Sequence, residues 1–209
     1  MDKILTTSSY GICLFSMESL QDFLKKEKIK SKKLLAFFQK NKKRYLFTQK
    51  EGIWVPISQI NSIKYHIKLK GYDEAFDDEW EQRLEYGGFN LEVKDGLWIS
   101  SIGSFLEFDA GKYTGSGETY KSSYGIMHYF SNKERWYQTL DGYKLYTDFK
   151  YDVPAGKYLL SVKGYARKEI VDRRAVNYGF QFELRKVDEF DGYKNPREEQ
   201  YDFNVAEMK

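Results

Sequence analysis

The chain has 209 residues, of which 18% are aromatic and 31% charged, and it has only three prolines. A chain of this length can bury about 70% of the surface that its unfolded form exposes. Its aromatic content excludes an intrinsically disordered protein. The 18 tyrosines and 15 phenylalanines favour β-strands, because an aromatic ring packs well on a pleated, half-buried surface.

The N-terminus and the cysteine content predict the compartment. Polar residues at 6–9 interrupt the apolar run that a secretion signal needs. No segment approaches the roughly 20 apolar residues of a membrane span. Cys13 is the only cysteine and cannot form an internal disulfide, which suits a reducing compartment. We therefore expect a cytoplasmic protein that does not enter a membrane, with Cys13 as a small buried residue.

The net charge of +3 hides an uneven distribution along the chain. Residues 16–50 contain 11 Lys and Arg against 3 Asp and Glu, whereas residues 51–209 contain 22 against 27. A basic N-terminal part thus precedes an acidic body. Such asymmetry bears on the choice of partners rather than on the fold.

The first 58 residues predict one strand and two short helices. Residues 4–15 alternate loosely, as a strand does. Leu20, Phe23 and Leu24 then follow helical spacing, and residues 34–38 repeat it less regularly. Ser16 is a candidate N-cap. Residues 41–44 are expected to be the solvated end of the second helix.

From residue 60 the apolar residues recur with a period of two. Ile63, Tyr65, Ile67 and Leu69 alternate with polar residues and predict a half-buried strand. Two further apolar runs flank Asp95-Gly96, a strong hairpin signal. Additional strands are expected at 105–108, 124–130, 143–151, 159–165 and 180–184, with a flexible loop at 111–123 and a polar tail from residue 188.

These patterns predict a mainly β protein with a short N-terminal α segment. Seven to nine short strands separated by turns are typical of an antiparallel β-sandwich. No long amphipathic helices separate the strands, which argues against a parallel α/β sheet. We expect a basic, partly helical segment over residues 1–58 and a β-sandwich domain over residues 59–209.

Catalytic and metal-binding motifs are not found. His66 and His128 both lie on predicted strands, where a structural role is the simpler interpretation. Gly111-Lys112 lacks the spacing of a phosphate-binding loop, and Gly115-Ser116-Gly117 is too tight for a nucleophile elbow. We predict no enzyme activity, no metal and no cofactor. Carboxylate catalysis beside Trp80 remains an alternative by residue type alone.

Two segments are candidate binding surfaces. The first is basic and offers phosphate-binding lysines for nucleic acid, with Lys25, Lys26, Lys42, Lys43 and Arg44 as its candidate residues. The second is acidic and surrounds an aromatic ring, an arrangement suited to docking a basic protein. Its candidate partner-binding residues are Asp77, Asp78, Glu79, Trp80 and Glu81.

Several short motifs resemble the competence-nuclease inhibitor (ComJ-like) family and other immunity proteins of bacterial polymorphic toxins. They are residues 63–66 (IKYH), the acidic segment reaching Trp80, the segment around Trp98, and residues 152–158 (DVPAGKY). Together they span about residues 60–165. The resemblance implies a non-enzymatic cytoplasmic inhibitor that holds a toxin, such as a nuclease, by protein–protein contact. The basic N-terminal segment lies outside it and departs from the acidic character of nuclease inhibitors.

Two other functions remain open. A nucleic-acid-binding protein would use the basic 25–44 segment. A carbohydrate- or ligand-binding β-sandwich module would also be rich in aromatic residues. The acidic surface and the basic segment therefore both stay candidate interfaces.

Overall fold

The computed structural model describes residues 3–172 and 175–208, in which twelve strands form one sheet. The strands are β1 (Lys3–Thr6), β2 (Gly11–Phe15), β3 (Trp54–Ser58), β4 (Lys64–Leu69), β5 (Trp80–Val93), β6 (Leu97–Ser101), β7 (Glu118–Lys121), β8 (Met127–Phe130), β9 (Glu134–Gln138), β10 (Lys144–Tyr151), β11 (Gly156–Arg167) and β12 (Tyr178–Val187). The helices are α1 (Met17–Lys26), α2 (Leu34–Lys40) and α3 (Lys42–Lys50), with short 3-10 turns η1 (Ile102–Phe105) and η2 (Ala110–Tyr113).

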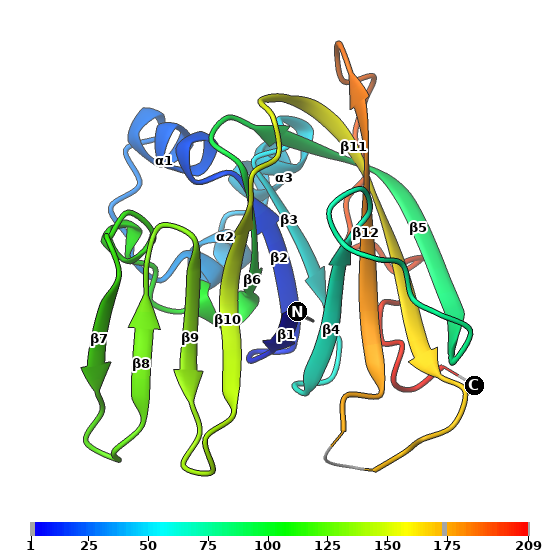
Figure 1. The fold of residues 1–209 in the computed structure, drawn as a ribbon. Coiled ribbons are helices and arrows are strands. Elements are labelled where there is room, and N and C mark those ends of the chain that lie inside the picture. The colour runs from blue at the N-terminus through cyan, green and yellow to red at the C-terminus, as the bar shows by residue number, and fades with distance from the viewer. Residues whose placement is uncertain (1–2, 173–174, 209) are drawn as a thin grey trace.

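Nine of these strands curve into a nearly closed barrel (Figure 1). Their order is β3-β2-β6-β10-β1-β4-β12-β11-β5. The two ends of this order approach each other where the backbone N–H of Glu92 in β5 donates to the carbonyl of Gly52, 2.7 Å away and just before β3. β1 pairs parallel with β10, and β12 pairs parallel with β4, while the other pairs are antiparallel.

Strand β10 is where the sheet branches. On one side, β10 pairs with β9 along most of its length. On the other side, Tyr146 pairs with Leu5 of β1, whereas Asp148 pairs with Ser100 of β6. The change of partner coincides with a register shift between Tyr146 and Asp148. Strands β7, β8 and β9 continue outward from β10 as a meander beside the barrel (Figure 1).

The strands nearest the helices are buried on both faces. In β2, Ile12 and Leu14 face the barrel core, whereas Cys13 and Phe15 belong to a second apolar cluster under the helices. β3 and β6 divide their side chains in the same way. A strand covered on both faces has a continuous apolar sequence instead of an alternating one.

Helices α1, α2 and α3 form a cap over the outer face of β2, β3 and β6. Trp54 is fully buried at its centre and stacks on Phe38 at 4.9 Å and on Phe105 at 5.3 Å. The predicted apolar residues Leu20 and Phe23 are buried, which confirms the first helix. Residues 42–44 begin a third helix, so the prediction that they end the second one was wrong.

The C-terminal segment is part of the barrel core. Phe203 and Val205 are buried there, and the ring of Phe203 lies 5.3 Å from Tyr86 and 6.1 Å from Phe89. The polar tail expected after residue 188 therefore folds back along β5 and adds apolar side chains to the barrel core.

The mainly β fold with a short N-terminal α segment is confirmed, but the β-sandwich prediction was wrong. A sandwich requires two sheets packed face to face, and the described strands form one continuous, curved sheet. Three strands from residues 1–58, β1, β2 and β3, pair within that same sheet. The boundary expected at residue 58 thus falls between two strands of the barrel.

The hairpin predicted around Asp95-Gly96 was also wrong, although both flanking strands exist. β5 pairs with β11, and β6 pairs with β2 and β10. The turn is held instead by Ser16, whose hydroxyl donates to the Asp95 carboxylate at 2.6 Å and accepts from the Lys94 N–H at 3.1 Å. The same carboxylate accepts from the Glu18 N–H at 3.2 Å, at the start of α1. Tertiary hydrogen bonds therefore direct the chain away from a local hairpin.

Two shorter segments differ from expectation as well. Residues 105–108 were predicted as a strand, but η1 ends at Phe105, which is buried under the helices. Residues 111–123 were predicted as a flexible loop, but they contain most of η2 and all of β7. Phe105 and Tyr113 are buried in the cluster under the helices, whereas β7 is an exposed strand paired with β8.

A buried ion pair fixes the branch point at β10. Asp148 is fully buried and pairs with Arg135 of β9 at 3.3 Å. It also accepts hydrogen bonds from the hydroxyls of Tyr113 at 2.9 Å and Ser104 at 3.2 Å. Burial alone would lower the pKa of Arg135, but the Asp148 carboxylate together with the hydroxyls of Tyr113 and Tyr120 outweighs it, so the pKa lies above its ordinary value. The network joins the meander, the barrel and both 3-10 turns.

Replacing Ser16 with Ala should lower the free energy of unfolding by about 2 kcal/mol, because the backbone N–H groups of Lys94 and Asp95 both donate to the Ser16 hydroxyl and would lose this acceptor. Urea denaturation measures the difference. Ser19→Ala is the matched control on the same helix, since the Ser19 hydroxyl is buried without a hydrogen-bond partner in the described structure. Its loss should leave stability unchanged or slightly raised. Equal destabilisation by both variants would contradict this role of Ser16.

Asp148→Asn should cost about 3 kcal/mol of unfolding free energy, because it leaves the Arg135 guanidinium buried without its counter-charge. Denaturation measures the loss, and hydrogen exchange should show faster opening of β7–β9 than of β11–β12. Glu118→Gln, at an exposed carboxylate on the meander, is the control and should be neutral. A neutral Asp148→Asn would show that the ion pair does not hold the branch.

Candidate functional site

The loop between β4 and β5 lies against the outer face of the barrel. Its Phe76 ring stacks on Tyr165 of β11 at 4.5 Å, and the Lys68 amino group lies 4.9 Å from the ring centre. Gly179 of β12 provides the space, because a Cβ atom there would collide with Phe76. These contacts anchor the acidic loop, residues 73–81, on the sheet.

Trp80, the first residue of β5, packs inward on this anchor. Its ring lies 4.7 Å from Phe76 and 5.4 Å from His66. The Arg167 guanidinium lies 4.8 Å from the same ring and forms an ion pair with Glu79. Trp80 is therefore only partly exposed and forms the base of the acidic loop rather than a free aromatic anchor.

The four predicted acidic residues are exposed, but their charges are not equivalent. Glu79 is paired with Arg167, and Glu81 lies 3.7 Å from Arg83. The Asp77 carboxylate accepts a hydrogen bond from the Glu79 N–H at 3.0 Å. No ion pair to Asp77 or Asp78 is found among residues 3–172 and 175–208. The structure thus brings the predicted set together and leaves these two carboxylates without a counter-charge.

A groove of about 1140 Å³ lies next to this loop on the outer face of β10, β1, β4 and β12. Ile4 and His66 are paired across β1 and β4, and their neighbours Leu5 and Tyr65 face the barrel core. Because side chains alternate along a strand, Ile4 and His66 face outward into the groove. Leu145 and Tyr178 also line it.

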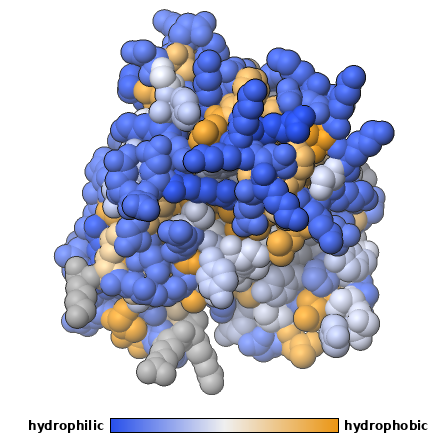
Figure 2. Space-filling model, turned by 180° about the vertical axis from the view of Figure 1, so that it is seen from behind, coloured by the Kyte–Doolittle hydropathy of each residue, from blue (hydrophilic) through white to orange (hydrophobic). Residues whose placement is uncertain are grey.

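Exposed apolar side chains form the rim of the groove at two loop tips. In the β9–β10 turn, Leu140 is 84% exposed and Tyr143 66% exposed. In the β11–β12 loop, Ile170 is 57% exposed and Val171 70% exposed. Tyr143 and Ile170 line the groove directly. Figure 2 shows a largely hydrophilic face on which hydrophobic side chains are scattered, some of them near the lower edge, the edge at which Figure 1 places both loops.

Arg167 connects the groove to the acidic loop, because it lines the groove and also pairs with Glu79. Sequence reasoning identified the acidic loop but missed the groove. A signal for the groove was present: Leu140 precedes the turn residues Asp141-Gly142, and Ile170-Val171 lies in a charged segment. Large apolar residues at such positions are exposed without serving the core.

The basic candidates lie on the helical cap, away from the groove-lining residues. Lys25 and Lys26 end α1, and Lys42, Lys43 and Arg44 begin α3. A 3.1 Å ion pair between Arg44 and Glu27 brings the two helix ends together. All ten lysines between residues 25 and 50 are exposed. The rings between them mostly serve the core, because Phe38 and Tyr45 are buried.

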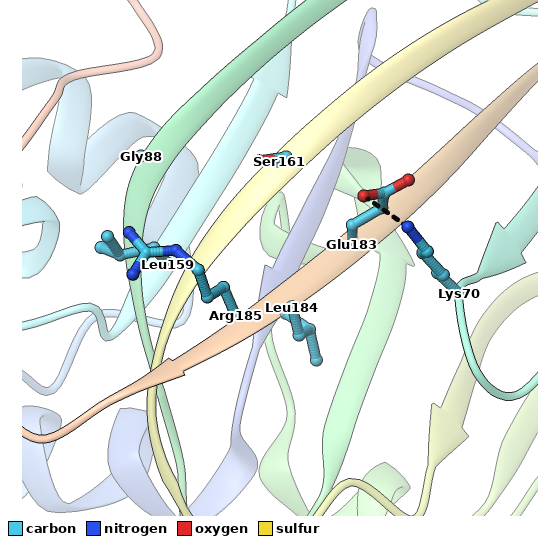
Figure 3. Close-up of a pocket in the computed structure, with 7 residues that line it drawn as sticks. All are labelled: Lys70, Gly88, Leu159, Ser161, Glu183, Leu184 and Arg185. Carbon is cyan, nitrogen blue, oxygen red and sulfur yellow. Dashed lines mark hydrogen bonds and ion pairs between the residues drawn. The ribbon is translucent and has the colours of Figure 1, made fainter.

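A smaller cavity of about 380 Å³ lies on the outer face of β11 and β12 (Figure 3). Its one carboxylate, Glu183, pairs with Lys70 at 3.2 Å and with Lys163 at 2.9 Å. Burial works against the charged form of Glu183, but the two lysines outweigh it and lower the pKa. This carboxylate is held as a paired anion, so it is poorly suited to acid–base chemistry.

The other reactive side chains have structural surroundings. His128 stacks on Tyr120 at 4.7 Å, and burial lowers its pKa. Cys13 is buried as predicted, and burial raises the pKa of its thiol. Among the described residues, no group of three or more His, Cys, Asp and Glu side chains is placed to hold a metal ion.

Every helix in residues 3–172 and 175–208 is too short or too polar to span a bilayer. Comparison of the chain with protein-family models, with curated proteins and with solved structures found no match.

Proposed function

We propose that this chain is a non-enzymatic binding protein that inhibits a basic protein partner, such as a bacterial nuclease toxin, by capping it with the groove and the acidic loop. The observation that carries the proposal is that an apolar-rimmed groove adjoins two carboxylates without a counter-charge. One surface thus offers both components of a protein interface, exposed apolar side chains and charged groups beside them.

The groove supplies the affinity in this proposal. Burying apolar surface contributes about 25 cal/mol per Å², and Leu140, Tyr143, Ile170 and Val171 expose most of theirs. Residues at loop tips carry this surface without disturbing the core. Large apolar and aromatic side chains that are desolvated at the centre of an interface dominate binding energy.

The acidic loop supplies the specificity for a basic partner. Asp77 and Asp78 are exposed, and the anchor of Phe76 and Trp80 holds the loop on the sheet. Fixed charges at the border of an interface raise the association rate and reject partners of like charge. A positively charged toxin surface is therefore the complementary occupant.

The motif resemblance supports the same function. Ile63 and His66, which belong to the motif at residues 63–66, line the groove, and Trp80 contacts His66. Two of the four motifs, residues 63–66 and the acidic segment reaching Trp80, thus adjoin one surface, whereas Trp98 is buried under the helices. In such a protein, a cytoplasmic location would let the chain meet its toxin before damage occurs.

The direct test is affinity capture with the tagged chain from a lysate of the source cells, at low and at moderate salt. The proposal expects one stoichiometric protein that is retained at moderate salt and is toxic when produced alone. Nucleic acid that elutes as salt rises would contradict it and favour the basic helical cap as the functional surface. A column that retains nothing at either salt would also contradict it.

Reversing charge at Asp77 and Asp78 to Lys should slow association with the captured partner about tenfold at low salt, because electrostatic steering is lost. The dependence of the rate on salt should also weaken. Surface-based kinetics measure both quantities. Asp191→Lys with Glu199→Lys is the matched control, since both residues are exposed in the C-terminal segment. An unchanged association rate in the Asp77/Asp78 variant would exclude the acidic loop as the steering surface.

Replacing Tyr143 and Ile170 with Ala should raise the dissociation rate and weaken the Kd at least tenfold, because these side chains lose apolar contact at the centre of the interface. Circular dichroism should show an unchanged fold, since both residues are exposed. Leu106→Ala removes a side chain that is 50% exposed elsewhere and should leave the Kd unchanged. If the variant with Ala at both 143 and 170 bound the partner as tightly as the unaltered chain, the groove would not be the interface.

A further inference from the structure

The C-terminal segment inserts one guanidinium between the rings of the helical cap. Arg197 lies 4.6 Å from the ring centre of Tyr45 and 5.2 Å from that of Trp54. Within residues 3–172 and 175–208, no carboxylate forms an ion pair with it. Burial lowers the pKa of Arg197 below its ordinary value. A partly buried cation is thus held by two aromatic faces without the anion that usually accompanies it.

Arg197 borders a cavity of about 570 Å³ at the end of β3. None of the residues that line this cavity is acidic. Its other polar side chains, all neutral, come from Ser9, Tyr10, Gln39, Ser58, Gln59 and Asn61. Amide N–H and hydroxyl groups donate hydrogen bonds to oxygen atoms. The cavity therefore combines one positive charge with several neutral donors.

The backbone around this cavity is held in an unusual conformation. Ser9, Tyr10 and Gln59 line it with φ values of 57°, 58° and 64°. In the described chain only one other non-glycine residue, Lys28, has a positive φ. Left-handed backbone is unfavourable for side chains with a Cβ atom, and such residues concentrate at ligand sites. Three of them at one cavity agree with a site built for a ligand.

We propose that this cavity binds a small organic anion, whose carboxylate or phosphate group pairs with the guanidinium of Arg197. The planar fork of arginine matches two oxygens of either group. The apolar walls formed by Leu35, Ile60 and Ile102 accommodate the carbon part of the ligand. The site shares no lining residue with the groove, so it stands independently of the proposed inhibitor function.

A purely structural Arg197 would act differently. It would attach the C-terminal segment to Tyr45 and Trp54 through cation–π contacts alone. Removing its charge would then destabilise the protein in every buffer, and anions would have no specific effect. In an anion site, the unpaired charge lowers the stability of the protein when the site is empty, and binding of the anion raises the stability again.

The test compares thermal unfolding of the full chain in inorganic phosphate, in acetate and in chloride at equal ionic strength. The variant Arg197→Met keeps an apolar side chain between the rings but lacks the charge. Arg185→Met removes an exposed arginine and is the matched control. Without oxyanions, Arg197→Met should be at least as stable as the unaltered chain. Phosphate or acetate should raise the Tm of the unaltered chain and of Arg185→Met, and not that of Arg197→Met.

A readout on the unaltered chain keeps the test independent of how the variant folds. The Nε–Hε signal of Arg197 in NMR should shift saturably as phosphate or acetate is added. Saturation by phosphate indicates a phosphorylated ligand, and saturation by acetate alone indicates a carboxylate ligand. If neither anion shifts this signal, or if the Tm of Arg197→Met rises as much as that of the unaltered chain, the site is refuted.

Discussion

The buried contact between Asp148 and Arg135 is the constraint on which the architecture depends. β10 has β9 on one side and, on the other, first β1 and then β6. Where a strand changes its partner, some polar groups at the junction lose the regular pairing of the sheet. Other groups must then supply their hydrogen bonds. Asp148 lies at this junction, pairs with Arg135 and accepts hydrogen bonds from Tyr113 and Ser104. The carboxylate thus joins the barrel, the meander and the 3-10 turns at one point.

The branch divides the outer face of the barrel into two surfaces with different roles. Beyond Asp148, along β6, β2 and β3, the outer side chains are apolar and are covered by the three helices. Before it, along β1 and β4, the outward-facing side chains of Ile4, Lys64 and His66 line the groove. Leu145 and Asp148 are three residues apart on β10. Leu145 lines the groove, whereas Asp148 contacts Ser104 and Tyr113 of the two 3-10 turns. The fold therefore creates the proposed docking surface by leaving part of one sheet uncovered.

The proposed inhibitor and anion sites use the same physical device, in which a charge is positioned by aromatic rings. Phe76 and Trp80 hold the acidic loop on the sheet, and Arg167 stacks on Trp80 while it pairs with Glu79. Tyr45 and Trp54 hold Arg197 at its cavity. Aromatic residues tolerate a neighbouring cation and exclude water from it. The high aromatic content of the chain thus serves binding surfaces as well as the two cores.

The sequence by itself determined the elements whose periodicity reflects a single buried face. The alternation from Ile63 to Leu69 predicted β4, and the spacing of Leu20 and Phe23 predicted α1. It also placed Asp77 to Glu81 together as an exposed acidic segment. Only the tertiary structure decided the pairing of the strands, the closure into a barrel and the inward packing of Trp80. The reason is that local periodicity indicates only whether a side chain is buried. The residues that contact it come from other elements of the chain, as Ser16 does for Asp95 and Arg135 for Asp148.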